Sequence, residues 1–251
     1  MAQSFYYVRA DEMFSLSGTV TQTAGGAIDS DYSLSWLVDA RPQRPVLGSS
    51  GTATYRITNT SAEVGIIAVC HHNLDAGKVV TVSNGLSATI TANTPTPPNG
   101  VPLNPFTTVT PTSVTALDFA ISGNSANLRI GEIIAGKRRT LTLPTMKSDK
   151  RGIATYVRKV DVDLSSVPPY DDGRSGRDPW KGSLLLTTSE LDNVIAWYES
   201  QRNGTRPSLI VPNTSVNDAW VGFLQAPDYE PLGPTFWRVS LTFVEEPRSR
   251  W

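Results

Sequence analysis

The feature that most constrains the fold is the run Val64–Cys70, VGIIAVC, which carries no polar side chain apart from the cysteine thiol. A continuous apolar run of this length predicts a β-strand that is buried on both faces. Other stretches alternate small or apolar residues with polar ones, as in Thr52–Thr58 and Ala154–Leu164. That alternation is typical of strands with one buried face. The sequence therefore predicts a mainly β protein.

Residues 131–138, GEIIAGKR, match most of the nucleotide-binding P-loop pattern G-x-x-x-x-G-K-[ST]. Arg138 stands where that pattern requires Ser or Thr. A P-loop also opens a helix, whereas the following residues alternate as in a strand and lead to Pro144. We interpret Gly131 and Gly136 as glycines of strands and expect no phosphate site here.

Two segments have the composition of loops. Residues 94–102, TPTPPNGVP, are rich in proline, which lacks a backbone donor, so a long surface loop is expected there. Residues 168–178, PPYDDGRSGRD, are also expected to form a mobile loop.

One amphipathic helix is predicted at about residues 188–203. Thr188 or Ser189 can cap its start, and Gly204 supplies its stop. Its apolar face is formed by residues at helical spacing, namely Leu191, Val194, Ile195 and Tyr198. The expected organisation is an N-terminal arm at 1–15, a β-sandwich domain at 16–138 and a second β domain at 139–251 that carries this helix.

Composition excludes several classes of protein. The net charge of −1 and a pI near 6.1 argue against a nucleic-acid partner bound by broad electrostatic attraction. The lone cysteine, Cys70, cannot form an intramolecular disulfide. The N-terminus lacks the pattern of a signal peptide, and no apolar run reaches the ~20 residues of a membrane helix. We expect a protein made in the cytoplasm without membrane insertion.

The sequence contains no recognisable set of catalytic or metal-binding residues. Cys70, His71 and His72 are adjacent, but neighbouring strand residues face opposite sides, and the chain has no other histidine or cysteine to complete a structural zinc site. No G-x-S-x-G motif is present. We therefore predict no metal, no cofactor and no enzymatic activity. A hydrolase that uses the region of His71 and His72 remains a minor alternative.

Aromatic residues lie near both ends of the chain. Phe5, Tyr6 and Tyr7 are close to the N-terminus, and Trp251 is the last residue. Exposed aromatic side chains often anchor protein contacts. These four residues are predicted to be assembly contacts.

Three stretches of the first predicted domain resemble a known family when taken in order. They are Ser35–Pro42 (SWLVDARP), Gly65–Leu74 (GIIAVCHHNL) and Asn127–Lys137 (NLRIGEIIAGK). Their order is similar to that in galactose-binding-like (discoidin-type) β-sandwiches of the jelly-roll type, including versions found in tail proteins of long-tailed bacteriophages. The resemblance implies ligand-rim loops, to which Asp39, Arg41, His72 and Asn73 would belong. For a glycan-binding module, the candidate rims are the segment at 39–50 and the proline-rich loop at 94–105. No calcium or sugar ligand set of such modules can be matched to this sequence.

The second predicted domain resembles the β-sandwich-plus-helix unit of phage tail-tip and tail-hub proteins. The resemblance is carried by Trp197–Glu199, Arg206–Pro212 and Trp237–Pro247. Such units form rings whose sheets continue across subunits, which implies contacts between copies of the chain.

The first functional hypothesis is therefore a structural virion protein of a tailed phage. It would be a minor tail or tail-tip (distal-tail-like) component, located in the virion tail and assembled as a homo-oligomeric ring with other tail proteins. The alternative hypothesis is a carbohydrate-binding module that recognises a host-surface glycan. In both hypotheses the protein acts by binding a partner through its surface rather than by chemistry at reactive groups.

Overall fold

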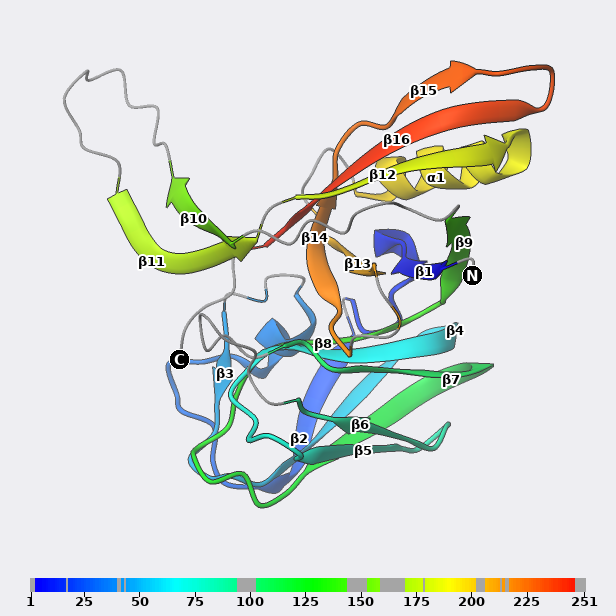
Figure 1. Ribbon diagram of the computed structural model, residues 1–251. Helices are drawn as coiled ribbons and strands as arrows, with labels where there is room; N and C mark the ends of the chain where they lie inside the picture. The colour runs from blue at the N-terminus through cyan, green and yellow to red at the C-terminus, as the bar shows by residue number, and fades with distance from the viewer. Residues whose placement is uncertain are drawn as a thin grey trace.

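A computed structural model describes residues 3–16, 18–39, 42, 44–93, 103–143, 153–158, 170–177, 179–201, 206–212, 214 and 217–246. The predicted mainly β class with one α-helix is confirmed. Two seven-stranded antiparallel sheets and a separate two-stranded hairpin make up the strands of this part of the chain. Figure 1 shows the first sheet below and the second sheet above it. The predicted loop at 94–102 lies outside the described residues.

The first sheet has the strand order β3-β8-β4-β7-β5-β6, with β2 also paired to β4. Its strands are β2 (Thr19–Gly25), β3 (Val46–Leu47), β4 (Ala53–His72), β5 (Val79–Ser83), β6 (Ala88–Thr91), β7 (Phe106–Ile121) and β8 (Arg129–Gly136). A short 3-10 helix, η2 (Leu34–Val38), lies between β2 and β3.

Strand β4 organises this sheet because it is 20 residues long and pairs with β7 along most of its length. On its other edge, β2 pairs with the first half of β4 and β8 pairs with the second half. The residues of β4 from Val64 onward are buried without interruption. The predicted two-faced burial of Val64–Cys70 is thus confirmed.

The second sheet has the order β12-β16-β14-β13-β1-β9, with β15 also paired to β16. Its strands are β1 (Gln3–Val8), β9 (Arg139–Leu143), β12 (Trp180–Thr187), β13 (Ser208–Val211), β14 (Trp220–Leu224), β15 (Asp228–Pro231) and β16 (Phe236–Glu245). A 3-10 turn, η1 (Ala10–Glu12), follows β1.

The N-terminal segment is part of this sheet rather than a separate arm. Strand β1 pairs with β13 on one side and with β9 on the other. Its side chains alternate between two apolar clusters, with Phe5 and Tyr7 on one face and Val8 on the other. A strand with both edges paired and both faces covered cannot behave as a free arm. The domain boundary near residue 138 stays a prediction.

Three apolar clusters hold the molecule together. The first lies within the first sheet and is mostly aliphatic. The second lies beneath the helix, against the second sheet. The third joins the two sheets, where Ile66, Ala68 and Cys70 of β4 face Leu209 of β13 and Val221 of β14. The buried position of Cys70 agrees with its expected place in the core.

The helix α1 (Thr188–Ser200) begins and ends close to the predicted positions, but its cap is different. Thr187 is the N-cap and accepts a hydrogen bond from the Glu190 backbone N–H, while the Glu190 carboxylate accepts one from the Thr187 N–H. This reciprocal arrangement is the capping box, which needs Ser or Thr three residues before Glu. The spacing from Thr187 to Glu190 meets that requirement, so Thr188 and Ser189 are not the cap.

Two further expectations concern glycines and loops. Gly131 and Gly136 lie inside β8, and a strand, β9, follows. A Cβ at Gly131 would come within 2.0 Å of the Pro42 carbonyl oxygen, which explains the glycine without any phosphate.

The segment expected to be a mobile loop contains a strand instead, because β11 (Tyr170–Arg177) pairs with β10 (Ile153–Arg158). Among the residues described, no helix has the length and apolar character needed to span a membrane.

Candidate binding site

A shallow open hollow of about 330 Å³ lies at the loop end of the first sheet. Its walls come from three segments that are distant in sequence: the chain after β2, the turn after β3, and the start of β8. The lining residues are Ala27, Ile28, Asp29, Leu47, Gly48, Ser49, Asn127 and Arg129.

The first two walls are joined to each other by backbone hydrogen bonds. Asp29 N–H donates to the Leu47 carbonyl at 3.0 Å, and Ser49 N–H donates to the Ala27 carbonyl at 2.8 Å. The Ser50 hydroxyl oxygen accepts from Gly26 N–H at 3.2 Å. These bonds hold the backbone of the two walls together, and Asp29 and Ser49 both line the hollow between them.

The third wall is held by the loop that follows β4. The Asn73 side chain accepts from Arg129 N–H at 2.8 Å and donates to the Asn127 carbonyl at 2.7 Å. Asn124 accepts from Asp75 N–H through its side-chain oxygen at 2.8 Å. The Asn73 amide therefore sets the backbone position of both Asn127 and Arg129, which line the hollow.

Asp75 connects the loop after β4 to the loop before β8. Its carboxylate accepts from the Ser125 hydroxyl at 2.7 Å and from the Ser125 N–H at 2.6 Å. These two hydrogen bonds, the hydroxyl first, hold the pKa of the Asp75 carboxyl below its ordinary value, because they stabilise the charged form. Asp75 is thus a structural residue of the loop end.

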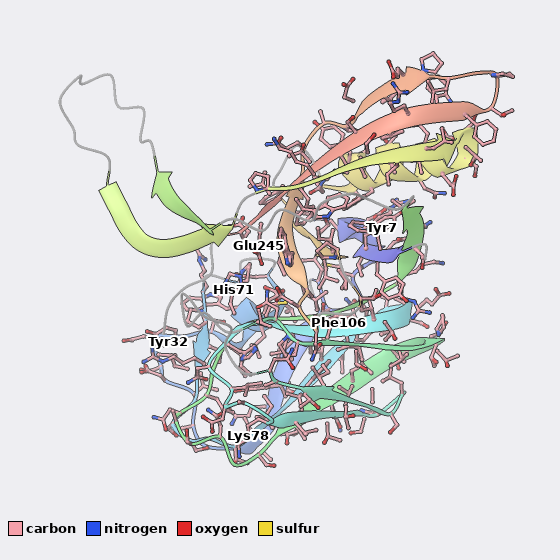
Figure 2. The ribbon with its side chains drawn as sticks, in the orientation of Figure 1. Tyr7, Tyr32, His71, Lys78, Phe106 and Glu245 are labelled. Atoms are coloured by element: carbon pink, nitrogen blue, oxygen red, sulfur yellow. The ribbon has the colours of Figure 1, made fainter. Side chains whose placement is uncertain are left out.

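An aromatic pair follows the first wall in sequence. The ring of Tyr32 meets the ring of Trp36 edge to face at a centroid distance of 5.6 Å, and the Arg44 guanidinium lies 5.9 Å from the centre of the Trp36 ring. Tyr32 N–H donates to the Asp29 carbonyl, so the pair is tied to the wall of the hollow. Figure 2 shows Tyr32 at the outer end of the first sheet, far from Tyr7 in the second sheet.

None of the individually predicted rim residues that the structure describes lines the hollow. Asp39 is half-buried at the end of η2, and Arg41 lies outside the described residues. His72 is buried, and its Nδ1 accepts from Leu74 N–H at 3.0 Å. The proton must therefore sit on Nε2, which donates to the Leu103 carbonyl at 2.9 Å. Because both ring nitrogens are engaged, His72 is a structural residue rather than a rim contact.

Asn73 comes closest to its predicted role. It does not line the hollow, but it positions two residues that do.

His71 is buried in the region between the two sheets, where Figure 2 also places Glu245. Its backbone φ is 51°, and its N–H donates to the side-chain oxygen of Asn104 at 2.9 Å. Within the described part of the chain, no three His, Cys, Asp or Glu side chains are arranged to hold a metal ion.

Of the predicted assembly contacts near the N-terminus, Phe5 and Tyr7 are core residues. Phe5 and Tyr7 are 0% and 1% exposed, so their rings cannot serve as surface contacts. Burial raises the pKa of Tyr7 to about 12. Tyr6 is half-buried with the Arg138 guanidinium 5.2 Å from its ring centre, and Trp251 lies outside the described residues. The alternation of side chains along β1 places the rings of Phe5 and Tyr7 under the helix.

Of the polar lining residues, Ser49 lies inside the candidate rim segment at 39–50, whereas Asp29 and Asn127 were not predicted as site residues from the sequence. Each belongs to a turn-like segment, as in Asp29-Ser30-Asp31 and Ser49-Ser50-Gly51. Turn composition could have marked these segments as loops. It could not show that the two segments lie side by side.

Comparisons with known proteins give structural similarity over about half of the chain. No family model matches the sequence, and no curated protein matches it. A chitosan-binding module from a Paenibacillus sp. IK-5 chitosanase/glucanase is 14% identical, with 50% of this chain and 98% of that one covered and a TM-score of 0.39.

The family 32 carbohydrate-binding module of C. perfringens NanJ, in complex with galactose, is 13% identical, with coverages of 54% and 99% and a TM-score of 0.36. SpGH29 is 12% identical with a TM-score of 0.39, and the match covers 51% of this chain and 28% of SpGH29. The fold assignment rests on the two sheets described above; the galactose-binding-like and tail-hub-like assignments stay predictions.

Proposed function

We propose that the chain is a binding module that holds a neutral saccharide in the hollow at the loop end of the first sheet. The observation that carries the proposal is the composition of this hollow. Ile28 and Leu47 supply half-buried apolar surface, while Asp29, Ser49 and Asn127 supply exposed polar side chains around it. A sugar ring has apolar C–H faces and a periphery of hydroxyls, so this combination suits it.

The charges of the hollow favour a neutral ligand. Asp29 contributes one negative charge and Arg129 contributes one positive charge. A carboxylate accepts hydrogen bonds from sugar hydroxyls, and a guanidinium donates to them. Their opposite charges offset each other, which removes any strong preference for an anionic or a cationic ligand.

Binding is better supported than hydrolysis. Asp29 is the carboxylate among the lining residues, whereas hydrolysis of a glycosidic bond generally uses two carboxyl groups. The Asp29 oxygen already accepts from Asp31 N–H at 3.1 Å, which orients the group in its turn.

The experiment is a glycan-array screen of the full chain, followed by calorimetric titration with the best-bound saccharide. Ser49→Trp should abolish binding, because a large side chain at this exposed position would fill the hollow. Asp29→Asn should weaken binding while keeping the oxygen that orients the turn. Asp228→Asn, an exposed site on β15, is the matched control and should bind as the wild type does. The proposal would be contradicted if the Ser49→Trp variant still bound the saccharide, or if the wild type bound no bacterial polysaccharide on the array.

A second candidate function is assembly, because the described part of the second sheet ends in an edge strand, β12, whose side chains are alternately buried and exposed. All eight residues of β12 pair with β16 on one side, and β12 is the last strand in the sheet order. Leu185 on this strand is 53% exposed. An edge strand offers hydrogen-bonding groups to another chain. In this reading the protein would be a ring-forming component of a phage tail, as the sequence resemblance implies.

Native mass spectrometry of the full chain, alone and with neighbouring tail proteins, tests assembly. If β12 forms the contact, Leu185→Lys should reduce the oligomeric fraction, whereas Leu232→Lys at the tip of the β15–β16 hairpin should not. A chain that stays monomeric under both conditions would contradict this candidate.

A further inference from the structure

The turn between β5 and β6 contains an Asn-Gly pair in an unusual backbone conformation. Asn84 and Gly85 are both exposed, with φ angles of 64° and 110°. The segment 84–86 is a bend without a hydrogen-bonded turn. Glycine carries no side chain that could shield its backbone nitrogen. The Gly85 nitrogen therefore lies in an open segment, next to the Asn84 side chain along the chain.

We propose that Asn84 is a site of spontaneous deamidation. The Gly85 nitrogen loses its proton to hydroxide and attacks the Asn84 side-chain carbonyl carbon. A bond forms between that nitrogen and carbon, the carbon–nitrogen bond of the side-chain amide breaks, and ammonia leaves. Water then opens the five-membered imide on either side, which gives aspartate or isoaspartate at position 84. No oxidant or reductant takes part.

The position of Asn84 gives this modification a structural consequence. Ser83, the preceding residue, pairs with Asp118 on β7, and the Asn84 side chain lies close enough to the Asp118 carboxyl to lower its pKa. Asp118 also accepts from Arg56 at 2.7 and 2.8 Å. Arg56 first, and Asn84 to a smaller extent, hold the pKa of Asp118 below its ordinary value. Deamidation replaces an amide donor by a second carboxylate beside Asp118.

The bend also lies against β7. A Cβ at Gly85 would come within 2.9 Å of the Ala116 carbonyl oxygen and 3.0 Å of Val114. Isoaspartate lengthens the backbone at position 84, so it would shift Gly85, which has no room to move closer to β7. The modified chain should therefore loosen the β5–β6 hairpin while β4 and β7 keep their pairing.

The test is peptide mapping by mass spectrometry after the full chain is incubated in mildly alkaline buffer. The sequence contains two other Asn-Gly pairs, Asn99–Gly100 and Asn203–Gly204, which serve as internal references. The peptide with Asn84 should gain the mass of an amide-to-acid conversion, with both aspartate and isoaspartate products and a rate that rises with pH. Asn84→Gln should suppress that conversion. An unmodified Asn84 after both references have converted would overturn the proposal.

The structural consequence is tested separately with Asn84→Asp, which needs no incubation. Repulsion from Asp118 should lower the Tm of this variant by about 1–3 °C at neutral pH. The loss should shrink in the double variant with Asp118→Asn, since the second carboxylate is then absent. Hydrogen exchange should quicken in β5 and β6 only. An equal Tm loss with and without Asp118→Asn would show that Asp118 is not the cause.

Discussion

The two sheets bury their apolar side chains in different ways. The core of the first sheet is mostly aliphatic and is built from strands that pack on one another, with Val80, Ile90 and Ile133 among its fully buried residues. The core of the second sheet is a group of aromatic rings beneath one helix, where Trp197 stacks on Tyr7 at a centroid distance of 4.5 Å. Aliphatic packing is spread over many small contacts, whereas an aromatic core depends on a few large side chains.

The surfaces of the two sheets differ as well. At the loop end of the first sheet, polar side chains such as Asn73 and Asp75 bind the backbone of neighbouring loops. The outer part of the second sheet instead exposes apolar side chains, including Leu185, Leu232 and Phe236 at 48–53%. The contrast indicates that side-chain hydrogen bonds join the loops at the end of the first sheet. The described part of the second sheet instead ends in an edge strand and exposes apolar side chains.

The largest effect is expected at the centre of the aromatic core. Trp197→Ala should lower the free energy of unfolding by about 3–5 kcal/mol, because it empties the space of a fully buried indole and removes the bond from its Nε1 to the Ser208 hydroxyl. Chemical denaturation measures the loss. Ser208→Ala removes only the hydrogen bond and should lower the free energy by about 1 kcal/mol. Similar losses for both variants would show that the core does not depend on the ring.

A smaller effect is expected where the two sheets meet. The Asn104 side chain accepts from His71 N–H and donates to the Ala219 carbonyl, both at 2.9 Å, and it is fully buried. Asn104→Ala should lower the free energy of unfolding by about 2–3 kcal/mol, since two buried hydrogen bonds are lost. Hydrogen exchange should then quicken at the ends of both β4 and β14.

Asn93 provides the matched control for this junction. Its side chain is half-buried and donates one bond to the Asn217 carbonyl at 2.8 Å. Asn93→Ala should therefore change the free energy of unfolding by less than Asn104→Ala does. Faster exchange confined to one sheet in Asn104→Ala would show that the Asn104 side chain does not couple the two sheets.

The loop end of the first sheet should respond to pH. The pKa of Asp75 is lowered in the folded protein, so its stabilising contribution is present above the ordinary value of 3.8 and is lost as the pH falls through the folded value. Asp75→Asn should accordingly be less stable than the wild type at neutral pH, with a difference that vanishes in acid. Thermal melts at a series of pH values give this comparison, and a difference that persists in acid would contradict it.

The smallest effect is expected at the open edge of the second sheet. Leu185→Ser should change the free energy of unfolding by less than about 0.5 kcal/mol, because the side chain is already largely exposed. Urea denaturation at low protein concentration measures this change. A large loss that appears only at high concentration would indicate that Leu185 is buried in an assembly.

Much of the β-structure could be predicted because strands carry a local signal. The run from Val64 to Cys70, the strand signal at Thr52–Thr58 and the helix from 188 were all visible as patterns of apolar residues along the sequence. The strand β11 was missed, because Asp171-Asp172-Gly173 and Gly176 have the composition of a turn. Its pairing with β10 overrode that local preference.

The candidate site was harder to predict than the strands. His72 was expected at a rim because of the resemblance to galactose-binding-like sandwiches, but its ring is hydrogen-bonded to Leu74 and Leu103 inside the protein. The hollow is formed by segments around positions 28, 48 and 128. No local pattern in the sequence relates segments that are separated by 20 to 100 residues in this way, since their contact follows from the pairing of whole strands.

The sequence by itself determined the helix and those strands that carry a local apolar pattern, because alternation, proline and glycine act over a few neighbouring positions. Only the tertiary structure decided that the first strand belongs to the second sheet. It places Phe5 and Tyr7 among Trp180, Trp197 and Phe243, all far along the chain. Backbone pairing between distant strands is set by the burial of both of their faces at once, and that condition is met only when the whole chain has folded.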